Sequence, residues 1–264
     1  MISLVKRHPI ITFFVLSYAL AWMLVPFGSF GAYGPLVAAL IVVPITQGVA
    51  GLKELGLRII RWRVRWYWYA VALGVPLAVH LAVVGLNVAS GAGVPSLTFA
   101  SVTAFLMVFA IRLINPTDGP LGENPGWQGF ALPGLQGSGY SPLIATAIVA
   151  PLVSLWHLPL FFWEPGGLQA SVLVSGLVVT MAATFFYNWL FNRTGGSVLL
   201  VILAHDLEGS IQYEIGWIVM GVWLAVAIGL VIFDWKAWRA PAPAEVTTPP
   251  QAMPPRGATP VTPA

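Results

Sequence analysis

Three short polar segments interrupt an otherwise apolar chain, and each carries an ionisable side chain beside or inside a hydrophobic run. They are 122–129 (GENPGWQG), 154–159 (SLWHLP) and 204–209 (AHDLEG). A charged residue at the centre of a membrane helix costs about 2.5–3.5 kcal/mol on insertion scales. Since only 8% of the residues are charged, we expect Glu123, His157 and His205 to face one another across a helix bundle and to do chemistry.

One carboxylate and two imidazoles support two routes to hydrolysis. Two neutral imidazoles can bind Zn²⁺ through nitrogen, while a Glu completes the site or acts as base toward a bound water. Without a metal, the Glu can activate water while a His stabilises the oxyanion. The chain has no cysteine, so a metal site would use His and carboxylate ligands. Phosphate-loop, GxSxG and HExxH motifs are absent from the sequence.

The composition predicts an integral, multi-pass membrane protein. Hydrophobic residues make up 58% of the chain, and its charged fraction is far below the roughly 25% of soluble domains. The apolar runs are continuous rather than alternating, which indicates helices and not barrel strands. We therefore predict an all-α bundle of about eight transmembrane helices, near 9–27, 32–49, 67–88, 98–115, 141–163, 168–191, 196–213 and 216–234, with a further helical segment at 121–136.

The predicted turns bring two of the three residues to the same depth. With a turn near 137–139, Glu123 lies about 15 residues before it and His157 about 18 residues after it, so each is roughly 22–27 Å from the turn. His205 lies about 10 residues past a turn at 194–196, or roughly 15 Å, which agrees less well. We expect a cavity between the fourth, fifth and seventh predicted helices.

The distribution of Lys and Arg predicts that both termini are cytoplasmic. Basic residues cluster before the first run, in the 51–66 segment, at Arg193 and in the C-terminal region, and Arg112 is placed near the cytoplasmic end of the fourth run. Segment 51–66 is interpreted as a loop that fixes topology, or as an amphipathic helix on anionic headgroups.

Two regions follow from this reading. Residues 1–239 form the membrane domain. Residues 240–264 contain eight prolines among Ala and Thr, a composition that cannot bury enough apolar surface to order itself. We expect a disordered, Pro-rich cytoplasmic tail.

The polar segments resemble the motifs of the CPBP family of intramembrane proteases, which includes CAAX prenyl endopeptidases and bacteriocin-processing and immunity relatives. Segment 121–136 is similar to the first family motif, in which a Glu pair is followed by three residues and then Arg. His157 matches the second motif and His205 the third. The motif core spans about 99–212. The resemblance implies that Glu123 activates water, and that His157 and His205 orient water, bind metal or stabilise the oxyanion.

The sequence departs from the family pattern at four motif positions. The second Glu is Asn124, the Arg is Gln128, the aromatic before the first His is Val153, and the Asn after the second His is Gly209. The changes at 124 and 128 together are charge-neutral, so an amide–amide contact is a candidate replacement for an ion pair. Gly209 deletes an oxyanion donor, and losing one such donor typically costs 10²–10³ in kcat.

Two functions from different classes follow. The first is an intramembrane endopeptidase that cuts a peptide or membrane-protein substrate, with Zn²⁺ as an optional cofactor. The second is a degenerate relative that acts as a binding, immunity or scaffold protein. A secondary transporter is disfavoured because the two halves lack paired Gly/Pro-broken helices. The expected setting is the lipid bilayer of a bacterial cytoplasmic membrane, and nucleic acid is not an expected partner.

Overall fold

The structure, a computed structural model, describes residues 2–94, 101–163, 167–211, 216–242 and 244–247. Within these residues the secondary structure is entirely helical, as predicted. The elements are α1 (Ile2–Arg7), α2 (Pro9–Trp22), η1 (Val25–Phe27), α3 (Gly34–Ile59), α4 (Tyr67–Ala89), α5 (Val102–Ile114), α6 (Pro120–Gly126), η2 (Trp127–Ala131), α7 (Leu132–Gly137), α8 (Pro142–Trp156), η3 (Leu158–Phe162), α9 (Ala170–Arg193), α10 (Val198–Ser210), α11 (Trp217–Phe233), α12 (Trp235–Arg239) and α13 (Ala244–Thr247).

Five segments are long and apolar enough to cross a membrane, which supports a multi-pass membrane protein. They are Pro9–Phe27, Gly34–Ile59, Tyr67–Ala89, Pro142–Phe162 and Ala170–Arg193. The remaining three of the eight predicted spans are shorter in the described residues: α5 and α10 have 13 residues each and α11 has 17. A span needs about 20 residues, so α5 and α10 are too short to cross alone. Parts of the predicted runs at 98–100 and 212–213 lie outside the described residues.

The basic 51–66 segment is not one structural unit. Residues up to Ile59 continue α3 beyond a kink at Gly48, where φ is 67°. Arg58 lies inside the protein, where its guanidinium donates to Glu54 Oε1 at 3.1 Å and to the Gly129 carbonyl oxygen at 2.9 Å. Because Arg58 is buried, its guanidinium is not available to anionic headgroups.

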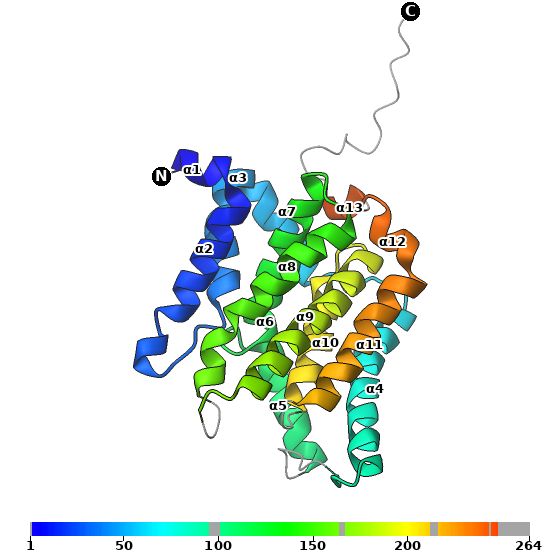
Figure 1. Ribbon diagram of the computed structural model, residues 1–264. Coiled ribbons are helices and arrows are strands. Elements are labelled where there is room, and N and C mark those ends of the chain that lie inside the picture. Colours follow the sequence, from blue (N-terminus) through cyan, green and yellow to red (C-terminus); the bar gives the residue numbers. More distant parts are fainter. Residues whose placement is uncertain (1, 95–100, 164–166, 212–215, 243, 248–264) are drawn as a thin grey trace, which may run out of the picture.

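Arg112 does not lie with the basic residues near the start of α10, which corrects its predicted position. Helices α1, α7 and α13 gather at one end, and α5 lies at the other (Figure 1). At the first end, the Ser197 hydroxyl, which caps α10, donates to the Arg61 carbonyl oxygen at 2.7 Å. Arg112 instead pairs with Asp206, in the last half of α10, at 3.1 Å. An ion-pair partner inside the bundle offsets the cost of placing this charge there.

Part of the Pro-rich tail is described and differs from the expected disordered segment. Residues Ala244–Thr247 form α13, in which Val246 is fully buried and its carbonyl oxygen accepts a hydrogen bond from Arg58 Nη2 at 2.8 Å. One anchored side chain therefore orders this short piece. Residues 243 and 248–264 of the predicted tail lie outside the described residues.

Helix α6 packs unusually close to the start of α3, and two glycines make this approach possible. A Cβ at Gly122 would lie 2.7 Å from the Ala32 carbonyl oxygen, and a Cβ at Gly126 would lie 2.5 Å from the Pro35 carbonyl oxygen. The spacing Gly-x-x-x-Gly places both on one helix face, as in close helix contacts within membranes. This contact sets the position of the intervening Glu123.

We expect Gly126→Ala to lower the apparent melting temperature in detergent, because the added methyl group meets backbone atoms that cannot move aside. Overpacking of this kind typically costs about 1–3 kcal/mol. Gly74→Ala is the matched control, since a Cβ there meets nothing within 4 Å and alanine favours the helix. Equal melting temperatures for the two variants would contradict the close packing of α6 on α3.

Candidate active site

The segment from Pro120 to Gly137 is an interrupted helix that presents its polar residues inward. Pro120 starts α6, and Pro125 lacks the N–H that a regular helix would use. The chain then widens into a π-helical turn at Trp127–Ala131, where the Leu132 N–H bonds the Trp127 carbonyl oxygen. Such turns occur frequently at functional sites. Here the buried side chains of Glu123, Asn124 and Gln128 all line one cavity.

His157 is held at the end of α8 by contacts to its own helix and to α2. Its Nδ1 donates to the Val153 carbonyl oxygen at 2.9 Å. The preceding Trp156 donates from its indole to the Ser17 carbonyl oxygen at 3.1 Å, and Trp22 donates to the Trp156 carbonyl oxygen at 2.9 Å. These bonds fix both the position of the ring and its tautomer.

Glu123 and His157 meet as the turn positions predicted, with 3.6 Å between Glu123 Oε2 and His157 Nε2. This separation is too long for a direct hydrogen bond. When the ring is neutral, its Nδ1–H is used by Val153, so Nε2 presents a lone pair. Two acceptors therefore face one another, and a water molecule between them would donate one hydrogen to each. Such a water is polarised for nucleophilic attack.

A chain of amide side chains connects His205 to the middle of the bundle. The Asn124 amide donates to Gln128 Oε1 at 2.9 Å, which confirms the predicted contact between the two amides. Gln128 then donates to Asn188 Oδ1 at 2.9 Å, and Asn188 donates to the Thr146 hydroxyl at 3.2 Å. At the other end, Asn124 Oδ1 accepts from His205 Nδ1 at 3.1 Å. A neutral His205 is thereby fixed with a lone pair on Nε2.

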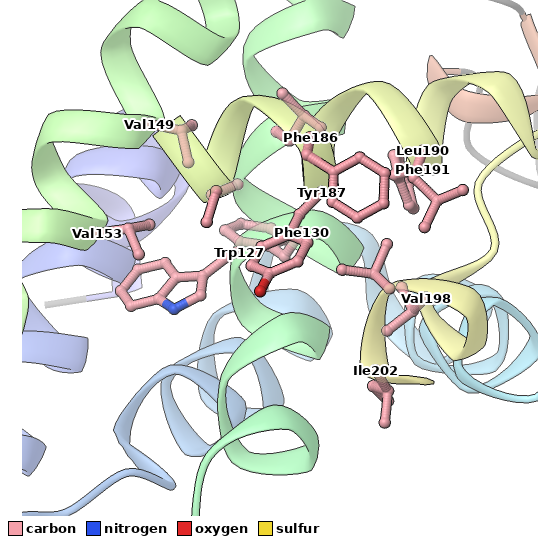
Figure 2. Close-up of a cluster of buried hydrophobic side chains, with 14 of the residues drawn as sticks. Trp127, Phe130, Val149, Val153, Phe186, Tyr187, Leu190, Phe191, Val198 and Ile202 are labelled. Atoms are coloured by element: carbon pink, nitrogen blue, oxygen red, sulfur yellow. The ribbon is translucent and has the colours of Figure 1, made fainter. Parts of the chain in front are cut away.

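The three predicted site residues line one cavity of about 320 Å³. Three buried polar atoms of this lining have no hydrogen-bond partner among the described residues: Glu123 Oε2, Trp127 Nε1 and Tyr187 Oη. The indole nitrogen and the hydroxyl lie on the same side of the apolar cluster, away from Phe186 and Leu190 (Figure 2). Leaving a buried polar group unpaired costs about 1–3 kcal/mol, so the cavity is built for a polar occupant such as water or a peptide group.

Helix α9 also lines the cavity, which corrects the expectation of a site between the fourth, fifth and seventh predicted helices alone. Its contribution includes Thr180, Thr184 and Tyr187. The Tyr187 ring stacks on His205 with 5.1 Å between ring centroids. Sequence reasoning missed Tyr187 because a tyrosine in an apolar helix gives no signal of its own; the nearby Asn188 was the better clue to a polar face.

Arg112 is the second residue that sequence reasoning missed. It lines the cavity beside Glu208 and Gly209. Its Nε donates to Asp206 Oδ1 at 3.1 Å and its Nη1 to Asp118 Oδ1 at 3.1 Å. A lone Arg inside an apolar run is itself a signal of function. In the sequence analysis, Arg112 served only as a marker of membrane topology and was therefore not included in the site. Asp206 holds Arg112, whereas Glu208 reaches the cavity.

The residues do not fit a three-ligand zinc site in this arrangement. Among the described residues, no three His, Asp or Glu side chains lie close enough together to hold one ion. The groups available for chemistry here are therefore the protein's own side chains.

Residues 98–207 match the model of the type II CAAX prenyl endopeptidase Rce1-like family. The matched segment starts just before α5 and ends within α10, so it contains Glu123, His157 and His205. A search of curated proteins found no match.

Proposed function

We propose that this chain, a member of the CPBP/CAAX protease family by its match over residues 98–207, is an intramembrane endopeptidase that cuts a peptide or membrane-protein substrate. The observation that carries the proposal is the facing pair of acceptors, Glu123 Oε2 and His157 Nε2, 3.6 Å apart at a cavity with unpaired polar atoms. This arrangement suits activation of water, because two acceptors that face one another across a cavity can both accept hydrogens from one water molecule.

In the proposed reaction, a water molecule donates hydrogen bonds to Glu123 and His157 and attacks the scissile carbonyl carbon with its free lone pair. The new C–O bond forms as one water proton moves to the Glu123 carboxylate and the carbonyl oxygen becomes an oxyanion. Collapse of the tetrahedral intermediate breaks the C–N bond, and Glu123 returns the proton to the leaving amine nitrogen. General base catalysis of this kind contributes about 10²–10⁴ in rate.

The alternative function is a binding, immunity or scaffold protein built on the same fold. Gly209 favours it, because this position lacks the side-chain amide of the family pattern. The chain of amide hydrogen bonds favours the endopeptidase, since Asn124 and Gln128 are hydrogen-bonded to one another and Asn124 still accepts a hydrogen bond from His205. A satisfied replacement is more consistent with a retained site than with a lapsed one.

We place both termini on the cytoplasmic side of a bacterial membrane and retain about eight membrane-embedded helices, with α5 and α10 as partial spans. The positive-inside rule supports this orientation, because α1 and the Arg61 loop lie at one end of the bundle (Figure 1). In this orientation Arg112 lies toward the opposite face.

The proposal is tested by incubating wild-type protein in nanodiscs with a pool of quenched fluorescent peptides and measuring the release of fluorescent product over time. An endopeptidase releases product over many turnovers. A binding protein instead retains intact peptide at no more than one per chain, detected by photocrosslinking, and this outcome without product would favour the alternative.

We expect the peptidase activity to persist after chelation, because the described residues do not place three ligands on one ion. Activity in 1,10-phenanthroline should stay within about twofold of the untreated rate. Loss of a catalytic group such as a general base would instead lower the rate by about 10² or more. Metal content measured by plasma mass spectrometry should be well below one zinc per chain. Stoichiometric zinc, with activity lost on chelation and restored by zinc, would contradict this expectation.

A further inference from the structure

We propose that Arg112 supplies the oxyanion donor that Gly209 lacks, so that the guanidinium, and not a side chain at position 209, binds the substrate carbonyl oxygen. The inference rests on the proposed function and assigns a catalytic role to a residue outside the polar motifs. It follows from three features of the cavity: where Arg112 lies, which of its nitrogens is free, and what His205 is able to donate.

The guanidinium occupies the space of the missing side chain. A Cβ added to Gly209 would lie 2.6 Å from Arg112 Nη2, and one added to Gly119 would lie 2.9 Å from the same atom. A larger residue at position 209 would therefore displace Arg112. Glycine at this position is then part of the site's construction and not simply the loss of a donor.

One nitrogen of Arg112 remains available for a ligand. Asp206 accepts from Nε and Asp118 accepts from Nη1, each at 3.1 Å. The hydrogen bonds described for Arg112 come from Nε and Nη1, so Nη2 is the nitrogen left to meet a ligand in the cavity that Arg112 lines. The Asp206 side chain is fully buried and that of Arg112 is only 13% exposed. The two carboxylates thus hold the guanidinium in a fixed orientation before substrate binds.

The site needs such a donor because neutral His205 does not provide one. Its Nδ1–H is donated to Asn124 Oδ1, which leaves a lone pair on Nε2. An oxyanion repels a lone pair and is stabilised by a preorganised donor. Arg112 carries a permanent charge, and charge-assisted hydrogen bonds are about twice as strong as neutral ones. A cationic donor therefore offsets the loss of a neutral amide at position 209.

The test compares kcat and KM for four forms in nanodiscs: wild type, Gly209→Asn, Arg112→Gln/Asp206→Asn and the triple change that combines them. Changing Asp206 together with Arg112 avoids leaving a buried carboxylate unpaired, and melting temperatures verify folding. We expect the double change to lower kcat by about 10²–10³ at nearly constant KM. Gly209→Asn alone should lower activity by displacing Arg112. In the triple variant the guanidinium no longer fills the space beside position 209, so the Asn amide fits there. The kcat of the triple variant should be at least tenfold higher than that of Arg112→Gln/Asp206→Asn.

Two results would overturn the proposal: a kcat within threefold of wild type for Arg112→Gln/Asp206→Asn, or a lost kcat that Gly209→Asn does not recover. A purely structural Arg112 would give the second result, since an added amide at position 209 does not restore packing. Failure of the proposed function is distinguishable, because wild type itself would then release no product.

Discussion

Glu123→Gln is expected to lower kcat/KM for peptide cleavage by about 10²–10⁴, the usual contribution of a general base. The amide keeps the size of the side chain but does not accept the water proton. Because Glu123 is buried and its Oε2 faces His157, removal of its charge should not destabilise the fold. The measurement is a full kinetic profile in nanodiscs together with a melting curve.

Glu208→Gln is the matched control for this prediction. Glu208 lines the same cavity, and the change removes the same charge, yet Glu208 does not contact His157 in the described ion pairs. Its kcat/KM should fall by less than tenfold. Equal losses in the two variants would mean that the cavity responds to net charge alone, and would contradict the role of Glu123.

Gln128→Arg alone is expected to destabilise the protein by about 3–5 kcal/mol, the usual cost of an uncompensated buried charge. Gln128 is 1% exposed, and both of its polar atoms are used, by Asn124 and by Asn188. The double change Asn124→Glu/Gln128→Arg should recover most of the stability, because it places a carboxylate beside the guanidinium. Melting temperatures of Asn124→Glu, Gln128→Arg and the double variant measure the coupling between the two positions.

A double variant no more stable than Gln128→Arg would contradict a compensated exchange at these positions. Asn124→Asp/Gln128→Glu serves as a control, since it keeps the side-chain sizes and adds two like charges. This control should be less stable than either the wild type or Asn124→Glu/Gln128→Arg.

The meeting of Glu123 and His157 was predictable because it depends on helix rise and turn position alone. Turns rich in glycine mark the ends of α7 and α9, and counting residues from a turn gives depth. The amide contact was predictable for a similar reason, since positions 124 and 128 are four residues apart and lie on one helix face. Both predictions use local geometry that the sequence specifies directly.

The position of Arg112 was not predictable from the positive-inside rule. That rule describes residues in loops, whereas Arg112 is held by Asp206, which is 94 positions away in the chain. Long-range pairs of this kind depend on how helices pack and leave no local pattern. The contribution of α9 was missed for the same reason, because Tyr187 lines the cavity only through the packing of α9 against η2 and α10.

The short lengths of α5 and α10 show a second limit of apolar runs. Hydropathy counts residues that tolerate lipid, but a buried helix such as α10 is covered by its neighbours and needs no full span. His205, Asp206 and Glu208 lie in its second half, where Arg112 and the cavity provide polar surroundings. The polar residues of α10, more than its apolar run, indicate which part of the helix faces the cavity and not lipid.

Mass spectrometry of a mixed peptide library tests the central claim most directly, with wild type, Glu123→Gln and Glu208→Gln in nanodiscs run side by side. The account predicts defined cuts made by wild type, retained by Glu208→Gln and absent from Glu123→Gln, with all three proteins folded. Cuts that persist unchanged in Glu123→Gln, or their absence from wild type while the peptides bind, would contradict a peptidase that activates water through Glu123.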